Sequence, residues 1–254
     1  ATLCLDKSDS FQYLIDRLIL RLTGWKEKCL SSGGKEVLIK SVAQAIPSYA
    51  MSVFKIPKFF CKRITDAISR FWSGDDASHK RMHWFTWWKM CIPRSRGGIG
   101  FRDIHCFYLA LLAKQAWRLI DDPESLCAKI LKAKYYPNDD LMNARLNKKA
   151  SYTWQSIMAG VETLKHGHIW RVGDGQKIKI WEDSWIPQSP SRKVISSRGN
   201  HLLSRVSELI DPVSGDWDSL LVNQTFCSVD AQRILAIPLP VHEMTDSVAW
   251  SFTK

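Results

Sequence analysis

The sequence lacks the short motifs that mark common catalytic sites. It contains no Walker A pattern, no G-x-S-x-G and no H-E-x-x-H, and residues 97–100 (GGIG) are not a G-x-G-x-x-G fingerprint. No apolar run approaches the roughly 18 residues of a membrane span, and the opening segment holds no apolar core of a signal peptide. We therefore expect no membrane partner and predict no catalytic residue. The absence of an initiator Met indicates a fragment or a processed chain.

Cysteine pairing motifs are also absent. The seven cysteines are odd in number, widely spaced and never in C-x-x-C, which is typical of reduced thiols in the cytosol or nucleus. His79, His83, Cys91 and His105 come nearest to a metal site, but only the first two have the spacing of one helix face. We predict no metal site and ordinary surface or core positions for these side chains.

Positive charge is what the sequence has in excess. Lys and Arg number 36 against 25 Asp and Glu, a formal net charge of +11 over 254 residues. The segment 1–200 carries +15 and the remainder −4. Such a basic body favours a polyanion partner, for which RNA, DNA or an RNA–DNA hybrid is the expected class. The alternative is a basic protein whose lysines and arginines are only solvated.

Apolar residues recur at helical spacing from near the start of the chain to Trp72. One stripe runs over 11–22, and a Ser-Ser-Gly-Gly breaker at 31–34 separates it from a second helix at about 35–46, with Val37, Leu38, Val42 and Ala45 facing inward. A third helix is predicted over 59–72. Residues 73–104 break this rhythm and indicate a loop-rich segment. The amino-terminal part is therefore expected to be a small helical unit.

Helical periodicity returns in the middle of the chain. A broad apolar surface over 106–121 predicts a helix buried on several sides. Another helix is expected at about 124–135, with Leu126, Ile130 and Leu131 facing the core. A further helix is predicted over 152–165.

The segment 169–181 (IWRVGDGQKIKIW) predicts a β-hairpin, because Gly-Asp-Gly separates two runs of alternating apolar and polar residues. A two-residue turn would split the apolar residues between both faces. An odd loop pairs Val172 with Ile178 and Trp170 with Ile180 on one face. The predicted fold class is therefore mainly α with a small antiparallel β-hairpin.

The chain is expected to divide into three parts. Residues 1–72 form a helical unit, and 73–187 form a connector that contains the central helices and the hairpin. Residues 188–254 form a linker and an acidic tail with short helical pieces at 203–210 and 228–235. We expect this tail to be weakly structured.

Paired aspartates at Asp75-Asp76 invite comparison with the metal-binding carboxylates of polymerases. That site needs apolar strands on both sides, whereas Ala-Ser-His-Lys-Arg follows here. These residues are interpreted as a solvated loop.

The candidate nucleic-acid-binding residues are lysines and arginines beside glycines or aromatics. Bare amides in the glycine-rich turn after Pro93 are expected to approach phosphates, and basic groups beside aromatic rings suit backbone tracking and base stacking. On the second helix the lysines are expected to point outward. The full set is Lys26, Lys28, Lys35, Lys40, Arg94, Arg96, Arg102, Lys129, Lys132, Lys134, Lys177 and Lys179.

Four stretches in fixed order resemble a known family. They are LTGWKEKCLSSGGKEVLIKSVAQAIPSYAMSVFKIP (22–57), HWFTWWKMCIPRSRGGIGFRDIHCFYLALLAKQAWRLI (83–120), LCAKILKAKYYP (126–137), and SYTWQSIMAG with IWRVGDGQKIKIWEDSWIP (151–187). Together they resemble plant LINE-type (non-LTR) retrotransposon reverse transcriptases, in the region after the polymerase palm. Similar stretches occur in proteins described as ribonuclease H proteins and in mitochondrial remnant open reading frames.

The resemblance implies a thumb-like helical unit plus a helical connector of a larger enzyme. The family's palm aspartates would lie upstream, and its zinc module and ribonuclease H carboxylates downstream, so this chain alone is expected to be inactive. Mg²⁺ is expected only for those missing palm and ribonuclease H domains, with no cofactor in this chain. Lys26, Lys35 and Lys40 would then hold the template–primer, and the palm domain of the parent polyprotein would be a protein partner.

The nucleus is the expected compartment, with a mitochondrial remnant as the alternative. Two other functions stay open: a decayed element fragment without activity, and a protein-interaction scaffold whose basic face is incidental.

Overall fold

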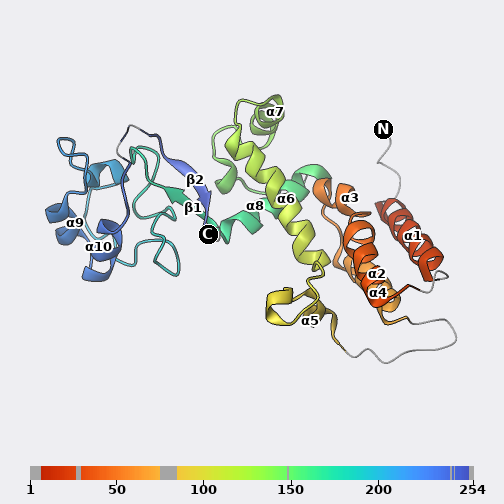
Figure 1. The fold of residues 1–254 in the computed structure, drawn as a ribbon. Helices are drawn as coiled ribbons and strands as arrows, with labels where there is room; N and C mark the ends of the chain where they lie inside the picture. The colour runs from red at the N-terminus through yellow and green to blue at the C-terminus, as the bar shows by residue number, and fades with distance from the viewer. Residues whose placement is uncertain are drawn as a thin grey trace. The chain divides into compact units, whose positions relative to one another are not determined.

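The computed structural model describes residues 7–26, 30–74, 85–147, 149–240, 242 and 244–251, with side chains from residue 11 to residue 25 in the first range. The chain divides into two compact units, Ala1–Leu164 (unit 1) and Lys165–Lys254 (unit 2). In its described part it is mainly α-helical with a small two-stranded antiparallel sheet (Figure 1), which confirms the predicted fold class. The division falls at 164/165, whereas the sequence suggested boundaries after 72 and 187.

Unit 1 consists of helices joined by short turns. α1 packs against α4, α2 against α4, and both α3 and α4 against the long α6. In Figure 1, α1, α2 and α4 lie side by side, and α5 and α7 lie at opposite ends of α6. The bounds are α1 Lys7–Lys26, α2 Ser32–Leu38, the π-helical turn η1 Ile39–Ala43, α3 Ser48–Val53, α4 Lys58–Ser73, α5 Trp87–Cys91, the 3-10 turn η2 Arg94–Arg96, α6 Ile104–Asp121, α7 Leu126–Tyr135, η3 Leu141–Asn143 and α8 Tyr152–Lys165.

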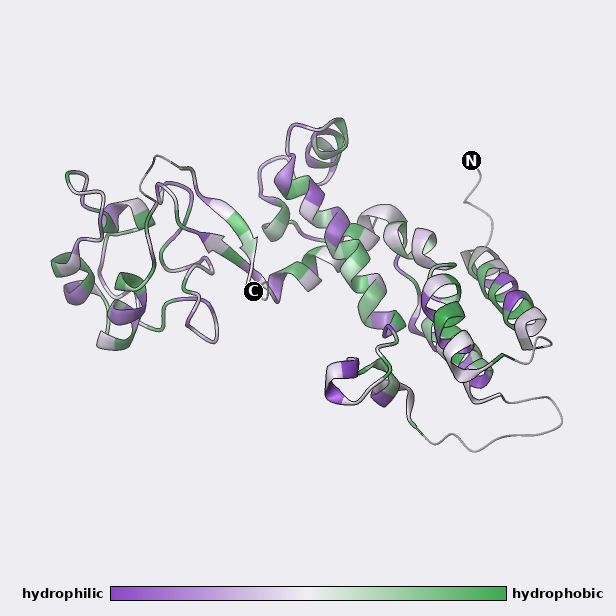
Figure 2. Ribbon diagram, in the orientation of Figure 1, coloured by the Kyte–Doolittle hydropathy of each residue, from purple (hydrophilic) through white to green (hydrophobic). Residues whose placement is uncertain are grey.

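The amphipathic stripes of α1 and α4 form the centre of this unit. The predicted α4 stripe is buried throughout, and the α1 stripe is buried except for Leu14, which is half-buried, and Ile19, which is exposed. Figure 2 shows the resulting alternation of hydrophobic and hydrophilic residues along both helices. The buried members are Phe11, Ile15, Leu18 and Leu22 of α1 and Phe60, Ile64, Ile68 and Phe71 of α4. Local periodicity was sufficient to predict this part of the core.

The second helix differs from its prediction in both start and face. Ser31 caps α2 by accepting the amide of Gly34 through its hydroxyl at 3.2 Å, so the expected breaker is the first turn of the helix. The helix then widens into η1, and Ile39 and Ala43 are buried while Val37 is exposed. A π-helical turn adds a residue to the turn and rotates the face that follows it, which accounts for the exposure of Ala45 after η1 but not for that of Val37 before it.

The prediction for α7 was wrong for two of its three inward residues. Leu126 and Ile130 are 75% and 56% exposed, whereas Leu131 is half-buried. The helix buries Ala128, and at its carboxy-terminal end Tyr135 and Tyr136 stack on Trp154 of α8 with ring centroids 4.6 and 5.5 Å apart. Aromatic stacking at one end therefore contributes to holding the helix, while its two largest amino-terminal apolar side chains stay exposed.

Helices α6 and α8 cross in close contact at Gly160. A Cβ atom on Gly160 would lie 2.3 Å from the carbonyl oxygen of Leu112. The backbones meet there without an intervening side chain. The crossing therefore depends on a residue with no side chain at position 160.

Unit 2 has little regular secondary structure. Its elements are β1 His168–Arg171, the 3-10 turn η4 Val206–Leu209, α9 Ser219–Thr225, α10 Ser228–Leu235 and β2 Ser247–Trp250. The helix α9 was not predicted from the sequence, whereas η4 and α10 fall within the predicted helical pieces. In Figure 1 the sheet lies at one end of this unit and α9 and α10 at the other.

The predicted hairpin within 169–181 does not form. Strand β1 pairs with β2 in antiparallel register, with Trp170 opposite Val248. The returning segment bonds elsewhere: the Val206 amide donates to the Ile178 carbonyl at 3.1 Å, and the Ile180 amide to the Ser204 carbonyl at 3.0 Å. The predicted apolar face survives, because Val172, Ile178 and Ile180 are all buried in one core.

The carboxy-terminal part is packed, contrary to the expectation of a weakly structured tail. Val206, Leu209, Val222 and Ile234 are fully buried in the same core as Trp185. This core draws on residues from 172 to 234 and is therefore built from contacts distant in sequence. None of the helices in the described ranges is long and apolar enough to cross a bilayer.

We expect Gly160→Ala to destabilise unit 1 by about 1–3 kcal/mol, because the new methyl group would force α6 and α8 apart. Thermal or denaturant unfolding followed by circular dichroism measures the change. Gly24→Ala in α1 is the matched control, since its Cβ would meet no atom within 4 Å. It should stabilise by up to about 1 kcal/mol through helix propensity. Equal effects of both substitutions would contradict the close crossing.

Candidate nucleic-acid interface

The net positive charge of the chain lies entirely in unit 1. Residues 1–164 carry 26 basic and 15 acidic side chains, whereas residues 165–254 carry 10 of each. A polyanion would be attracted to unit 1 at long range and not to unit 2.

Glu36 of α2 organises the cations nearest to the glycine-rich turn. Its Oε1 atom lies 2.6 Å from Lys40 Nζ and 2.6 Å from Arg94 Nη2, and its side chain is only 16% exposed. The hydrogen bond from Lys40 lowers the pKa of Glu36; burial opposes this, and Arg94 lowers it further. The structure thus brings Lys40 and Arg94 together around one shared carboxylate.

Lys35 and Lys40 do not point freely outward as expected. Lys40 Nζ also donates to the Ile99 carbonyl at 2.7 Å, with its charge 5.9 Å from the centre of the Phe101 ring. Lys35 Nζ lies 3.5 Å from the Trp72 carbonyl and 5.8 Å from the Phe71 ring centre. Both lysines are half-buried and connect α2–η1 to neighbouring segments.

The glycine-rich turn is closed by its own backbone hydrogen bonds. The amide of Gly97 donates to Arg94, that of Gly98 to Pro93 and that of Gly100 to Ile92, at 3.0, 3.2 and 2.9 Å. The expectation that these amides are bare for phosphates was therefore wrong. Gly97 has φ +84°, the left-handed conformation that closes η2.

The arginines of this turn differ in their availability. Arg94 is 71% exposed but paired with Glu36. Arg96 is exposed, and its side chain has no ion pair or hydrogen bond within the described ranges. Arg102 is exposed and its guanidinium lies 4.6 Å from the ring centre of Phe107. Arg96 and Arg102 are thus the cations here that a phosphate could approach.

The lysines of α7 form a separate group. Lys129 pairs with Glu124 at 2.8 Å, and Lys134 lies 5.3 Å from the ring centre of Tyr135. Lys132 and Lys134 are exposed. Figure 1 places this helix at the opposite end of α6 from the glycine-rich turn.

The remaining predicted residues lie elsewhere. Lys177 and Lys179 belong to unit 2 and are exposed, as the hairpin pattern predicted. Lys26 ends α1, but its side chain lies outside the described residues, as does all of Lys28. Asp75, Asp76, His79 and His83 also fall outside them.

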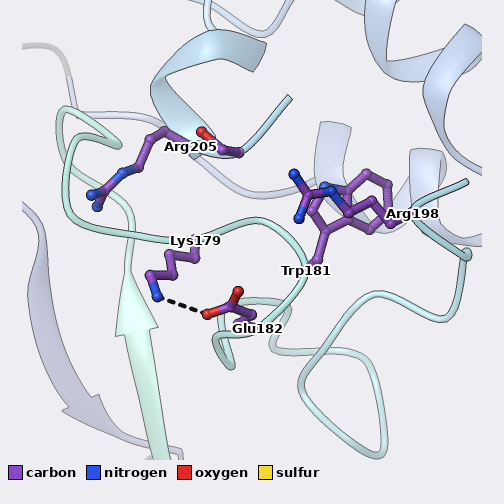
Figure 3. A pocket seen from close by; sticks show the side chains of 6 residues that line it. Lys179, Trp181, Glu182, Arg198 and Arg205 are labelled. Atoms are coloured by element: carbon purple, nitrogen blue, oxygen red, sulfur yellow. Dashed lines mark hydrogen bonds and ion pairs between the residues drawn. The ribbon is translucent and has the colours of Figure 1, made fainter. Parts of the chain in front are cut away.

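Lys179 lines a pocket of about 190 Å³ in unit 2 (Figure 3). The sequence predicted none of its other lining residues, which are Trp181, Glu182, Arg198, Ser204 and Arg205. They come from two segments, 179–182 and 198–205, which the bond from the Ile180 amide to the Ser204 carbonyl joins. A search of the sequence for clusters of basic residues could not have found this pocket, because Arg198 lies in the predicted linker and Arg205 in the acidic tail.

Asp246 supports the Gly-Asp-Gly loop of unit 2. Its buried carboxylate accepts the amides of Gly173, Gly175 and Lys177 at 2.8, 2.9 and 2.8 Å. Asp230 acts in the same way on the linker. It accepts the amides of Ile195 and Ser196, each at 2.7 Å.

Metal ligands and the thiols of Cys61 and Cys91 give no further site among the described residues. No group of three His, Cys, Asp or Glu side chains among them could hold a metal ion. Burial raises the pKa of Cys61 and Cys91 to about 11, which leaves both as thiols at neutral pH. Cys106, Cys127 and Cys227 are exposed free cysteines.

Asp246→Asn should destabilise unit 2 by about 3 kcal/mol, because an amide cannot accept three backbone N–H groups as a carboxylate does. Hydrogen exchange of the amides at 173, 175 and 177 should accelerate together, and denaturant unfolding gives the free energy. Asp174→Asn is the control in the same loop, since that exposed carboxylate accepts only the Gln176 amide, at 3.1 Å. A comparable loss in both variants would contradict the special role of Asp246.

Asp230 makes stability depend on pH in the acid range. Burial raises its pKa, but the hydrogen bonds from Ser196 and Ile195 outweigh this and hold the pKa below the ordinary value of 3.8. The group therefore stabilises the fold above pH 4, and this contribution is lost as pH falls through the folded-state pKa. We expect the stability difference between the native chain and Asp230→Asn to shrink below about pH 4. A difference constant from pH 7 to pH 2 would refute this.

Comparison with curated proteins gives two relatives from Arabidopsis thaliana. The chain is 39% identical over 143 residues to "Uncharacterized mitochondrial protein AtMg00310", a match covering 56% of this chain and 93% of that protein. It is 34% identical over 185 residues to "Putative ribonuclease H protein At1g65750", covering 72% of this chain. The chain spans only 30% of that second protein's length.

No protein-family model and no solved structure matches the chain. The first relative is matched over nearly its whole length, and 39% of the aligned residues are identical. The chain therefore belongs to the family of the uncharacterized mitochondrial protein AtMg00310.

Proposed function

We propose that the chain is a non-catalytic nucleic-acid-binding segment, the thumb and connector, of a retrotransposon RNA-directed DNA polymerase of the plant LINE type. The observation that carries this proposal is the confinement of the whole +11 charge to the helical unit 1–164. The name of the second relative supports it, because a ribonuclease acts on a nucleic acid. The match to under a third of that protein fits a segment of a larger enzyme.

The two groups of available cations in unit 1 suit a duplex backbone. Arg96 and Arg102 lie before the start of α6, and Lys132 and Lys134 lie beyond its end. An 18-residue helix is about 27 Å long, or about eight base-pair steps of a duplex. Contacts at both ends of α6 would therefore follow one strand over most of a turn and hold a template–primer.

Lys35 and Lys40 have a different part in this proposal. Their ammonium groups bond to carbonyls of the chain itself, so they fix the scaffold that presents Arg96 and Arg102. A variant at Lys40 would lose binding through a disturbed fold. Binding tests are therefore better directed at the exposed arginines.

The partner domain and the compartment follow from the same proposal. The palm of the parent polyprotein would cover apolar side chains that unit 1 leaves exposed, such as Leu20 of α1 and Tyr49 of α3. Mg²⁺ would serve the palm and ribonuclease H domains. The nucleus is the compartment we propose, and the mitochondrion is the alternative that the first relative's name favours.

A protein-interaction scaffold is the second candidate function. The exposed Leu126 and Ile130 beside Lys129 on α7 favour it, because apolar residues on a basic helix face can bind an acidic amphipathic partner. A decayed fragment without activity is the third possibility, and binding measurements separate all three.

Binding of the full chain to an RNA–DNA hybrid should weaken steeply as salt increases, because bound cations displace counterions from the phosphates. The double variant Arg96→Gln/Arg102→Gln should bind more weakly and lower the slope of log K against log[salt] by about 2, one unit for each lost phosphate contact. Fluorescence anisotropy with a labelled hybrid between about 50 and 200 mM salt measures both.

Arg17→Gln/Arg21→Gln is the control of equal charge, since both arginines are exposed on α1. It should leave the slope nearly unchanged. Equal losses of affinity in the two double variants would mean that binding depends only on the overall charge of unit 1. That result would refute the proposed contacts. Absence of salt-dependent binding would favour the scaffold or the decayed fragment.

A further inference from the structure

The pocket beside Lys179 is not used by the proposed function of unit 1. It has a volume of about 190 Å³, space for about six water molecules at their liquid density. Its six lining residues include three cations, one carboxylate and one tryptophan. We propose that this pocket binds a phosphate group, carried by a nucleotide or free in solution. The inference concerns unit 2 and is independent of the duplex interface.

The guanidinium of Arg205 is held by the chain through one of its nitrogens, and in Figure 3 it points away from Trp181 and Arg198. Its Nη1 atom donates to the carbonyls of Gln176 and Lys177 at 3.0 and 3.1 Å, which anchors the guanidinium. Within the described residues its Nε and Nη2 atoms have no acceptor. That edge is the one that donates two parallel hydrogen bonds to a phosphate. Because the side chain is already held, little conformational entropy is lost on binding.

The charges of the lining match a phosphate dianion. Lys179 Nζ pairs with Glu182 Oε2 at 2.7 Å (Figure 3). The pair is neutral as a whole, since Lys179 and then Arg198 hold the pKa of Glu182 below its ordinary value. Arg198 and Arg205 form no ion pair among the described residues, although Glu182 interacts electrostatically with Arg198 and Glu208 with Arg205. Arg198 makes only a long 3.5 Å contact with the His201 carbonyl, so its guanidinium can turn toward a ligand.

Trp181 gives the pocket a surface for a base. Its indole N–H donates to the Leu203 carbonyl at 2.8 Å, and its ring is tilted against Phe226 with centroids 5.4 Å apart. The ring is thereby fixed, yet it stays half-buried at the pocket wall. His201 stacks on the indole with ring centroids 6.4 Å apart, so a base attached to the bound phosphate would stack by displacing that exposed imidazole, whereas inorganic phosphate would gain nothing from it.

Isothermal titration of the full chain with inorganic phosphate and with AMP tests the inference. Both should bind with saturation, and Arg198→Gln should weaken both by about tenfold through the loss of a charge-assisted hydrogen bond. Glu182→Gln should tighten both, because it removes the only negative charge of the lining and frees Lys179. A purely structural role of these side chains would not produce tighter binding.

Arg171→Gln is the control, since this exposed arginine of β1 does not line the pocket; it should change neither affinity. If AMP binds more tightly than phosphate, and Trp181→Phe or Trp181→Ala removes the difference, the ligand is a nucleotide. Equal binding of the two ligands assigns phosphate itself.

The inference would be overturned by a lack of saturable binding, or by affinities that neither Arg198→Gln nor Glu182→Gln changes. Arg96→Gln/Arg102→Gln should leave these titrations unchanged, so the two proposals can fail separately.

Discussion

The carboxylate of Asp246 is the contact on which unit 2 depends most. It joins β2 to the loop 173–177 by accepting three backbone amides. The carbonyls of that same loop hold the guanidinium of Arg205. A unit with short strands and helices must satisfy many backbone groups without ladders, and buried carboxylates do so here. The position of Arg205 in the proposed phosphate pocket thus depends on Asp246, although Asp246 does not line the pocket.

Unit 1 is held by a related contact, in which the charged group that joins two segments is a cation rather than a carboxylate. Lys40 bonds to Glu36 and to the Ile99 carbonyl, so a cation joins α2–η1 to the glycine-rich turn. Cations near the core bond to acceptors of the chain itself in this way, because burial of an unpaired charge would be costly. Those left for a ligand are at the periphery, as Arg96 and Arg102 are. A count of basic residues therefore overstates the number of cations that can contact a nucleic acid. Burial of each side chain determines which of these cations are available.

Local patterns predicted the parts of the fold that local contacts build. The stripes of α1 and α4 and the extent of α8 follow from helical periodicity. The pairing of β1 does not, since its partner β2 lies near the carboxy-terminal end of the chain and competes with a nearer segment of equal apolar pattern. The exposure of Leu126 and Ile130 was equally hard to predict, because the position of α7 depends on contacts distant in sequence, such as the stacking of Tyr135 and Tyr136 on Trp154.

The candidate sites differ in predictability for an electrostatic reason. Net charge sums all side chains and so points to unit 1, but a sum of zero for unit 2 conceals Arg198 and Arg205, which form no ion pair among the described residues. The same difference has a physical consequence. A field from many like charges acts at a distance and is screened by salt, whereas a pocket in a neutral unit attracts a phosphate only at contact. The two sites should therefore recognise phosphate by different means: one by counterion release along a strand, the other by the fixed geometry of Arg205.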